Sequence, residues 1–139
     1  IAGAGKYKEE LQDLVQSLGI EDKVAFIGVV TDLADVMKIS DAFLFPTRWE
    51  GFGLVVAEAI LAGLPPIVSK HTACGEMVTD GLNGLTVDDP ENIDQIASAI
   101  LKMADDSVLR EKLKSNCGKL PFDLSIEHNV SEFLKLAME

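Results

Sequence analysis

Basic side chains are scarce in this sequence. Of its 139 residues, 12 are Lys or Arg and 23 are Asp or Glu, so the formal net charge is −11 at pH 7. Surfaces that bind nucleic acid or acidic membranes need clustered basic residues, and the twelve here are scattered along the chain. The composition therefore predicts no nucleic-acid partner and favours small molecules, or another part of the same protein, as partners.

Metal-ligand and nucleophile patterns are also absent. The two cysteines, Cys74 and Cys117, are far apart and too few for a disulfide framework, so we expect reduced thiols. The two histidines, His71 and His128, lie in no catalytic or metal motif, and a polar loop or surface position is the favoured interpretation of each. Neither an Asp-x-Asp pair nor a Cys/His cluster of ligand spacing occurs, so the sequence predicts no metal and no cofactor.

Long apolar runs are missing too. None approaches the ~20 residues that a membrane-spanning helix needs, and residues 1–6 show no signal-peptide pattern. We therefore expect a soluble, cytoplasmic protein.

Apolar residues nevertheless make up 47% of the chain, enough to build the core of one globular domain, and 139 residues leave no room for two. Strand patterns alternate with helix patterns, which predicts an α/β fold with a parallel sheet and right-handed crossovers. The expected strands are residues 23–30, buried and ending at Gly28, then 42–45, 67–69 and 85–87. The expected helices are a packing helix at 6–18 closed by Gly19, one through 37–39, one after Gly53, one at 109–113 and a terminal helix at about 125–138.

Three local signals refine these bounds. Pro65 and Pro66 force an extended entry into the strand at 67–69. Glu76 is expected to start a short helical turn, and Asp89-Pro90-Glu91 reads as the N-cap and first two residues of a helix. Residues 1–5 look like the end of a strand and a glycine turn without the expected strand body.

The stretch from Arg48 to Gly63 carries the chemistry. Gly51 and Gly53 allow the backbone to approach a ligand closely, and the free N–H groups at the start of the following helix suit a phosphate. Glu58 is the only ionisable residue of that apolar helix, and a carboxylate buried there without a partner would cost several kcal/mol. We therefore interpret Glu58 as facing a ligand, and Glu50 as an acceptor of hydrogen bonds from a polyol such as a sugar.

These residues resemble a known family. Glu50 and Glu58, with Gly-Phe-Gly-Leu between them, are similar to the Glu-x7-Glu signature of retaining glycosyltransferases of family 4, the group 1 family with the GT-B fold. Further similar segments follow in the family's order: Phe-Ile-Gly at residues 26–28, Ser-Asp-Ala-Phe-Leu-Phe-Pro at 40–46, Ala-Gly-Leu-Pro at 62–65, Gly-Glu-Met-Val at 75–78 and Asp-Gly-Leu-Asn-Gly-Leu at 80–85.

The resemblance implies a Rossmann-like parallel sheet flanked by helices. Residues 1–139 would be a single, partial C-terminal nucleotide-sugar-binding domain that lacks its first strands. An N-terminal acceptor-binding domain would be missing, and any peripheral membrane association would come through that domain.

The resemblance also implies roles for individual residues. Glu50 would contact hydroxyls of the transferred sugar near the anomeric centre, as nucleophile or as stabiliser, and Glu58 would hold the ribose hydroxyls. N–H groups for sugar and phosphate would come from Gly51, Phe52, Gly53 and Leu54. The nucleobase would lie against the loop at Val30 and Thr31, and the further candidates beside the donor are Trp49, His71 and Gly3.

The implied reaction is sugar transfer from a nucleoside-diphosphate sugar to an acceptor with retention of configuration. Two departures complicate it: Thr72-Ala73 stands where the family tends to have Gly-Gly, and the family's diphosphate-binding Arg and Lys would lie upstream of Ile1. We therefore expect the chain alone to be inactive. The alternatives are a non-catalytic nucleotide- or partner-binding module on the same scaffold and, less favoured, a sugar-nucleotide epimerase.

Overall fold

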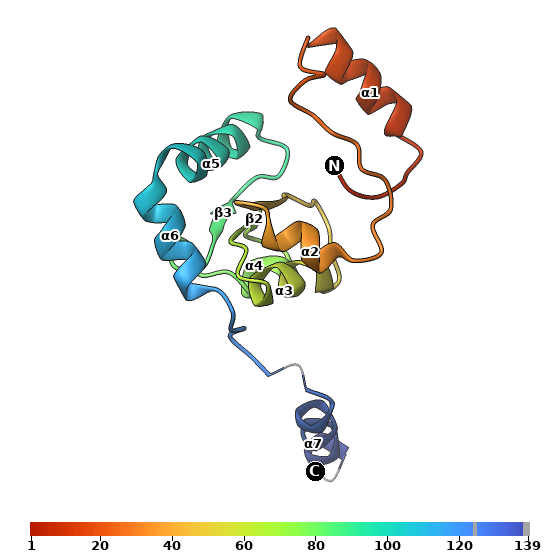
Figure 1. The fold of residues 1–139 in the computed structure, drawn as a ribbon. Helices are drawn as coiled ribbons and strands as arrows, with labels where there is room; N and C mark the ends of the chain where they lie inside the picture. Colours follow the sequence, from red (N-terminus) through yellow and green to blue (C-terminus); the bar gives the residue numbers. More distant parts are fainter. Residues whose placement is uncertain (124, 138–139) are drawn as a thin grey trace. The chain divides into compact units, whose positions relative to one another are not determined.

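The computed structural model describes residues 1–123 and 125–137 (Figure 1). The chain divides into two compact units, Ile1–Asp35 and Val36–Glu139, and each is described by itself. The assignment of residues 1–139 to a single domain of a larger enzyme stays a prediction. No helix in the described ranges is long and apolar enough to cross a membrane.

The first unit contains helix α1, Lys8–Ser17, which ends in the left-handed conformation of Gly19, φ 64°, as its sequence predicts. The expectation that α1 packs against a core is wrong in this unit. None of its residues is buried, and Leu11, Leu14 and Leu18 are all exposed. A helix buries its apolar stripe only where a sheet or another helix covers it, and this unit contains no sheet.

Residues 23–30 do not form the predicted buried strand. Their only ladder contact is an isolated bridge between Ala2 and Gly28, with Gly3 N–H donating to the Gly28 carbonyl at 2.6 Å. Ile27 is 47% exposed, and Gly28 adopts φ 69°, a left-handed conformation that ends extended pairing. The sequence has the residues of a strand here, but among the described residues the segment pairs only through this single bridge.

The second unit is built on a parallel sheet of three strands, β1 (Phe43–Phe45), β2 (Pro66–Ser69) and β3 (Leu85–Val87), in the order β1-β2-β3. Leu44 pairs with Ile67, and Val68 pairs with Thr86. All four residues of β2 are buried, as expected for a central strand covered on both faces. Pro66 stands at its first position, where the missing N–H is tolerated. The predicted strands at 42–45, 67–69 and 85–87 are confirmed.

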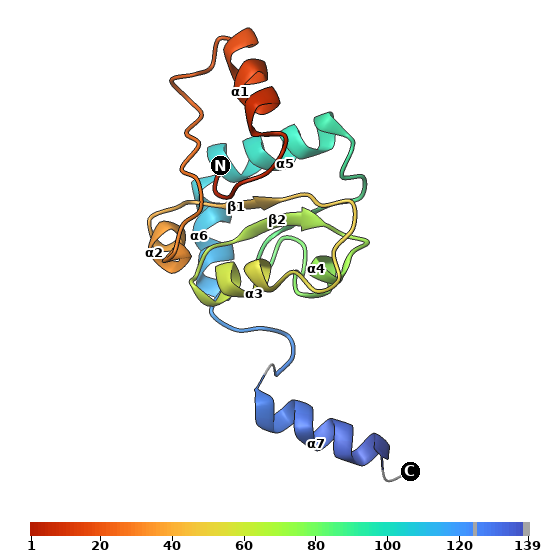
Figure 2. The same ribbon diagram turned by 90° about the vertical axis from the view of Figure 1, so that its right-hand side faces the viewer.

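Helices cover both faces of this sheet (Figure 2). Alternation along β2 sends neighbouring side chains to opposite faces, so Val68 packs beneath α3 (Leu54–Leu61) and α4 (Ala73–Glu76), while Ile67 packs with α5 (Ile93–Asp105) and α6 (Ser107–Asn116). On the first face, Val56 and Ile60 of α3 are fully buried, each stabilising the fold by about 1.5–3 kcal/mol. This arrangement is the predicted α/β fold with flanking helices.

The remaining elements are α2 (Leu33–Lys38) and α7 (Ile126–Ala137). Helix α2 matches the segment predicted around residues 37–39, and α7 matches the terminal helix expected at about 125–138, whose last position lies outside the described residues.

Two predicted helix starts are wrong. Glu76 ends α4 rather than starting a turn, because α4 begins after Thr72. The N-cap of α5 is Asn92, whose side chain accepts a hydrogen bond from Gln95 N–H, whereas Asp89 accepts one from Glu91 N–H before the helix begins. Asp and Asn are both favourable N-cap residues, so residue type does not distinguish the two positions. The hydrogen bond from Gln95 N–H identifies Asn92 as the N-cap.

Candidate functional site

Glu50 lies in the loop that leads from β1 to α3, and its side chain folds back over that loop. Its Oε1 accepts hydrogen bonds from the N–H groups of Gly51 at 2.9 Å and Phe52 at 3.5 Å. Two of the donors that the sequence assigned to a ligand therefore hold the Glu50 carboxylate instead. The carboxylate is half-buried, and its orientation is set by the backbone of its own turn.

Gly53 places this turn against the core. It adopts φ 79° at the N-cap of α3, a conformation that residues with a Cβ rarely adopt. A Cβ at this position would overlap Sγ of Cys74, the fully buried cysteine of α4. Burial raises the pKa of the Cys74 thiol, and the negative charge of Glu50 raises it further. The thiol is thus a neutral packing group beneath the Glu50 turn.

Hydrogen bonds to β2 fix the start of the same loop. Ser69 Oγ donates to the Thr47 carbonyl at 2.6 Å, and Thr47 Oγ1 donates to the Trp49 carbonyl at 2.9 Å. The carboxyl ends of β1 and β2 are therefore tied together. Parallel α/β sheets bind ligands at this edge.

A pocket of about 450 Å³ opens beside Glu50. It brings together three residues predicted to serve the site, Trp49, Glu50 and His71, from the loops that follow β1 and β2. Trp49 is 85% exposed, so its indole does not cover the sheet. The other lining residues are Arg48, Lys70, Thr72, Ala73 and Glu76.

Acidic side chains contact three basic residues that line this pocket. Arg48 Nε lies 2.8 Å from Glu91 Oε1, Lys70 Nζ lies 3.2 Å from Asp88 Oδ1, and His71 Nε2 lies 3.7 Å from the same Asp88 oxygen. Sequence reasoning did not find these contacts, because they join loops after three different strands. The only available signal was that each loop follows a strand of one parallel sheet.

The other predicted site residues are not gathered in this pocket. Glu58 is exposed on α3, and its carboxylate makes no hydrogen bond or ion pair within the described ranges, so the cost of burying it does not arise. Leu54, at the start of α3, is 64% exposed. Gly3, Val30 and Thr31 belong to the first unit.

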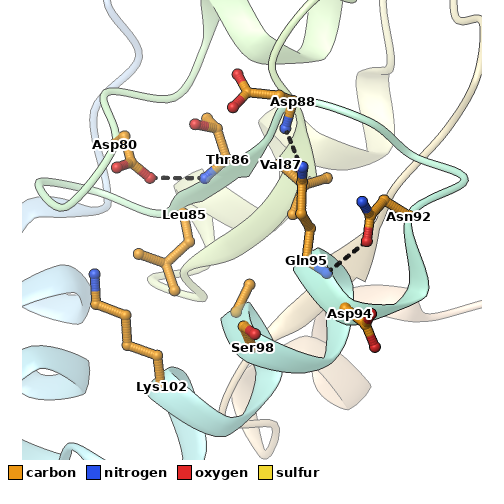
Figure 3. A pocket seen from close by; sticks show the side chains of 11 residues that line it. Asp80, Leu85, Thr86, Val87, Asp88, Asn92, Asp94, Gln95, Ser98 and Lys102 are labelled. Atoms are coloured by element: carbon orange, nitrogen blue, oxygen red, sulfur yellow. Dashed lines mark hydrogen bonds between the residues drawn. The ribbon is translucent and has the colours of Figure 1, made fainter.

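A second pocket, of about 470 Å³, lies between β3 and α5 (Figure 3). Two of its polar side chains accept hydrogen bonds from backbone N–H groups of other lining residues. Asp80 Oδ1 accepts from Thr86 N–H at 2.8 Å, and Asn92 Oδ1 accepts from Gln95 N–H at 3.1 Å. No residue of the stretch from Arg48 to Gly63 lines it, so we assign the candidate site to the Glu50 pocket.

In the part of the chain that the structure describes, no group of three or more His, Cys, Asp or Glu side chains is placed to bind a metal ion. The expectation that no cofactor is needed stays a prediction.

The family model described as "Glycosyl transferases group 1" matches residues 1–119. The chain belongs to this family. It is 33% identical to the uncharacterized glycosyltransferase MJ1607 of Methanocaldococcus jannaschii, over 100% of this chain and 37% of that protein. It is 35% identical to the GDP-mannose-dependent alpha-(1-6)-phosphatidylinositol monomannoside mannosyltransferase of Mycobacterium tuberculosis, over 74% of this chain and 29% of that protein.

Among solved structures, the C-terminal domain of the glycosyl transferase group 1 family protein LpcC from Francisella tularensis is 31% identical, with a TM-score of 0.71 over 79% of this chain and 57% of that one. The structural neighbours are glycosyltransferases of the GT-B fold, so the predicted fold is confirmed. The chain spans well under half the length of the two curated relatives named above.

Proposed function

We propose that this chain is the donor-binding part of a retaining glycosyltransferase of family 4, which transfers a sugar from a nucleoside-diphosphate sugar to an acceptor. One observation carries the proposal: Glu50 lines a pocket beside the glycine turn that precedes α3. The similarity to the C-terminal domain of a group 1 protein supports a place at the carboxyl end of a longer enzyme.

The site residues take the following roles in this proposal. Glu50 accepts hydrogen bonds from the transferred sugar, whose hydroxyls replace the N–H groups that the carboxylate now holds. Gly51 and Phe52 N–H then become free to donate to the ligand, as do Gly53 and Leu54 at the first turn of α3. The positive end of the α3 dipole favours a phosphate there by about 0.3–1 kcal/mol. Glu58 holds the ribose hydroxyls.

Nuclear magnetic resonance of the isotopically labelled chain tests the binding part of the proposal. Titration with UDP, GDP and ADP is expected to shift the amide signals of residues 50–58 at millimolar concentration of one nucleotide, while those of α6, remote from the Glu50 pocket, stay in place. The proposal is wrong for this chain if no amide of residues 50–58 moves with any nucleotide.

Substitution of the two glutamates in the full-length protein distinguishes the proposed enzyme function from that of a non-catalytic binding module. Glu50→Ala and Glu58→Ala each abolish or strongly reduce sugar transfer if the proposed roles hold. Unchanged biological function in both variants would favour the binding module that shares this scaffold.

The chain alone is proposed to be inactive. Catalysis by positioning contributes roughly 7–11 kcal/mol to lowering a barrier, and it requires an acceptor held against the donor. Incubation of the purified chain with labelled UDP- and GDP-sugars and simple glycoside or lipid acceptors is expected to give no product. Turnover within a factor of ten of the full-length protein would contradict this part of the proposal.

A further inference from the structure

The loop between β3 and α5, residues 88–92, is held rigidly by α5. Gln95 Oε1 accepts hydrogen bonds from the N–H groups of Asp88 at 3.1 Å and Asp89 at 3.2 Å, and Figure 3 shows the first of these bonds. Asn92 caps the helix below them through Gln95 N–H. The backbone that carries Asp88 is therefore fixed before any ligand arrives.

The carboxylates of this acidic loop reach the basic groups of the Glu50 pocket from outside it. Asp88 contacts Lys70 and His71, and Glu91 contacts Arg48, yet neither Asp88 nor Glu91 lines the pocket itself. Each basic side chain of the lining thus already has an acidic partner.

The charge at this pocket is consequently negative. Its lining includes two permanent cations, Arg48 and Lys70, and two carboxylates, Glu50 and Glu76. Asp88 and Glu91 add two further carboxylates at the rim. An anionic substituent on the sugar would compete with Asp88 for Lys70 and would face like charges, because both Arg48 and Lys70 of the described lining already have an acidic partner.

We propose that Asp88 and Glu91 determine donor specificity by confining the pocket to sugars without a negative charge, such as neutral or amino hexoses, and by rejecting uronic acids and phosphorylated sugars. The inference rests on the proposed function, in which the transferred sugar enters the Glu50 pocket. It gives the acidic loop a role that the Glu50 and Glu58 signature does not include. The pocket would discriminate between donors by weakening the binding of those with an anionic sugar.

The test replaces Asp88→Asn and Glu91→Gln together in the full-length protein. The matched control is Asp94→Asn with Glu111→Gln, which removes the same number of charges from residues that form no ion pair within the described ranges. Dissociation constants are measured for the nucleoside diphosphate alone, for its neutral hexose derivative and for the corresponding uronic acid derivative. One series consists of UDP, UDP-glucose and UDP-glucuronic acid. The other consists of GDP, GDP-mannose and GDP-mannuronic acid.

We expect the uronic acid derivative to bind more weakly than the neutral one to the unmodified protein. The loop variant should narrow that ratio by about tenfold, because two nearby charges are removed. The control should leave the ratio unchanged. The nucleotide is itself anionic, but any change in its binding to the loop variant is shared by its two sugar derivatives and cancels in their ratio.

Three outcomes would overturn the inference. If the unmodified protein binds both derivatives equally, or if the loop variant keeps the original ratio while the nucleotide still binds, the specificity role is wrong and the proposed function stands. If no nucleotide of either series binds the unmodified protein, the proposed function fails and this inference fails with it.

Discussion

Gly53 and Cys74 lie so close together that there is room for only one side chain, that of Cys74. The Cys74 sulfur lies where a Gly53 side chain would have to be, and it also approaches the Phe52 carbonyl at 3.8 Å. The left-handed backbone of Gly53 would by itself disfavour a side chain there. The turn that carries Glu50 therefore depends on a glycine for two independent reasons.

Gly53→Ala is expected to destabilise the protein by about 3 kcal/mol, because a left-handed alanine costs roughly 1–2 kcal/mol and overpacking against Cys74 adds a similar amount. Urea unfolding measures the change. Gly63→Ala is the matched control: Gly63 has φ 82° but no atom within 4 Å of an added Cβ, so only the backbone cost of about 1–2 kcal/mol applies. Equal losses in the two variants would show that contact with Cys74 does not matter.

Glu50→Gln should separate the fold from the proposed chemistry. The amide oxygen of Gln can still accept from Gly51 N–H, so the free energy of unfolding should change by less than about 1 kcal/mol. Sugar transfer by the full-length protein should fall at least a hundredfold, an order typical for the loss of one electrostatic contact to the reacting centre. Activity close to that of the unmodified protein would remove Glu50 from the catalytic role.

Asn83 is a buried polar residue in the connection between α4 and β3, and its loss should be costly. Its Oδ1 accepts from Thr79 N–H at 2.8 Å and its Nδ2 donates to the buried Met77 carbonyl at 3.1 Å. Asn83→Ala leaves that carbonyl unpaired, and we expect a loss of about 2 kcal/mol in urea unfolding. The exposed Asn116, whose Nδ2 donates to the Lys112 carbonyl, is the control, and Asn116→Ala should cost less than about 0.5 kcal/mol.

The free energy of unfolding should fall at alkaline pH because the half-buried Cys117 thiol loses its proton there. Burial raises the pKa of its thiol from 9.0 to about 11. The folded state holds this proton more tightly than the unfolded state, so the contribution is fully present below pH 9 and is lost as the pH rises toward 11. Urea unfolding at pH 8 to 11 should show a steeper decline for the unmodified protein than for Cys117→Ala. Parallel declines would mean that the thiol titrates normally.

Local patterns in the sequence were sufficient for the strands of the second unit and for helix α3. The run through Phe45, the Pro65-Pro66 entry to β2 and the helix after Gly53 are local signals, and each one matched the structure. Residues 23–30 carried an equally good strand pattern and failed, because a strand requires a partner that a local pattern does not supply.

The candidate site was predictable as far as its own loop and His71 in the loop after β2. Glu50 and the glycine turn could be found because they are consecutive. The contacts of Asp88 with Lys70 and His71 could not, since they depend on how two loops from neighbouring strands project at the sheet edge. The N-cap of α5 could not be predicted for a similar reason. Asp89 and Asn92 are both suitable N-cap residues by type, and only the position of Gln95 decides between them.

The central position of β2 has a consequence for how the chain folds. Both of its partners lie about twenty residues away in sequence, and both pairings are parallel, so no hairpin can form first and template the rest. Closing either crossover alone gives a two-stranded sheet in which the other edge of β2 is still unpaired. The buried faces of Ile67 and Val68 are completed only when the helices of both sides have docked. The transition state for folding should therefore already contain β2 paired on both sides, and the segment is exposed to intermolecular pairing for as long as either neighbour is absent.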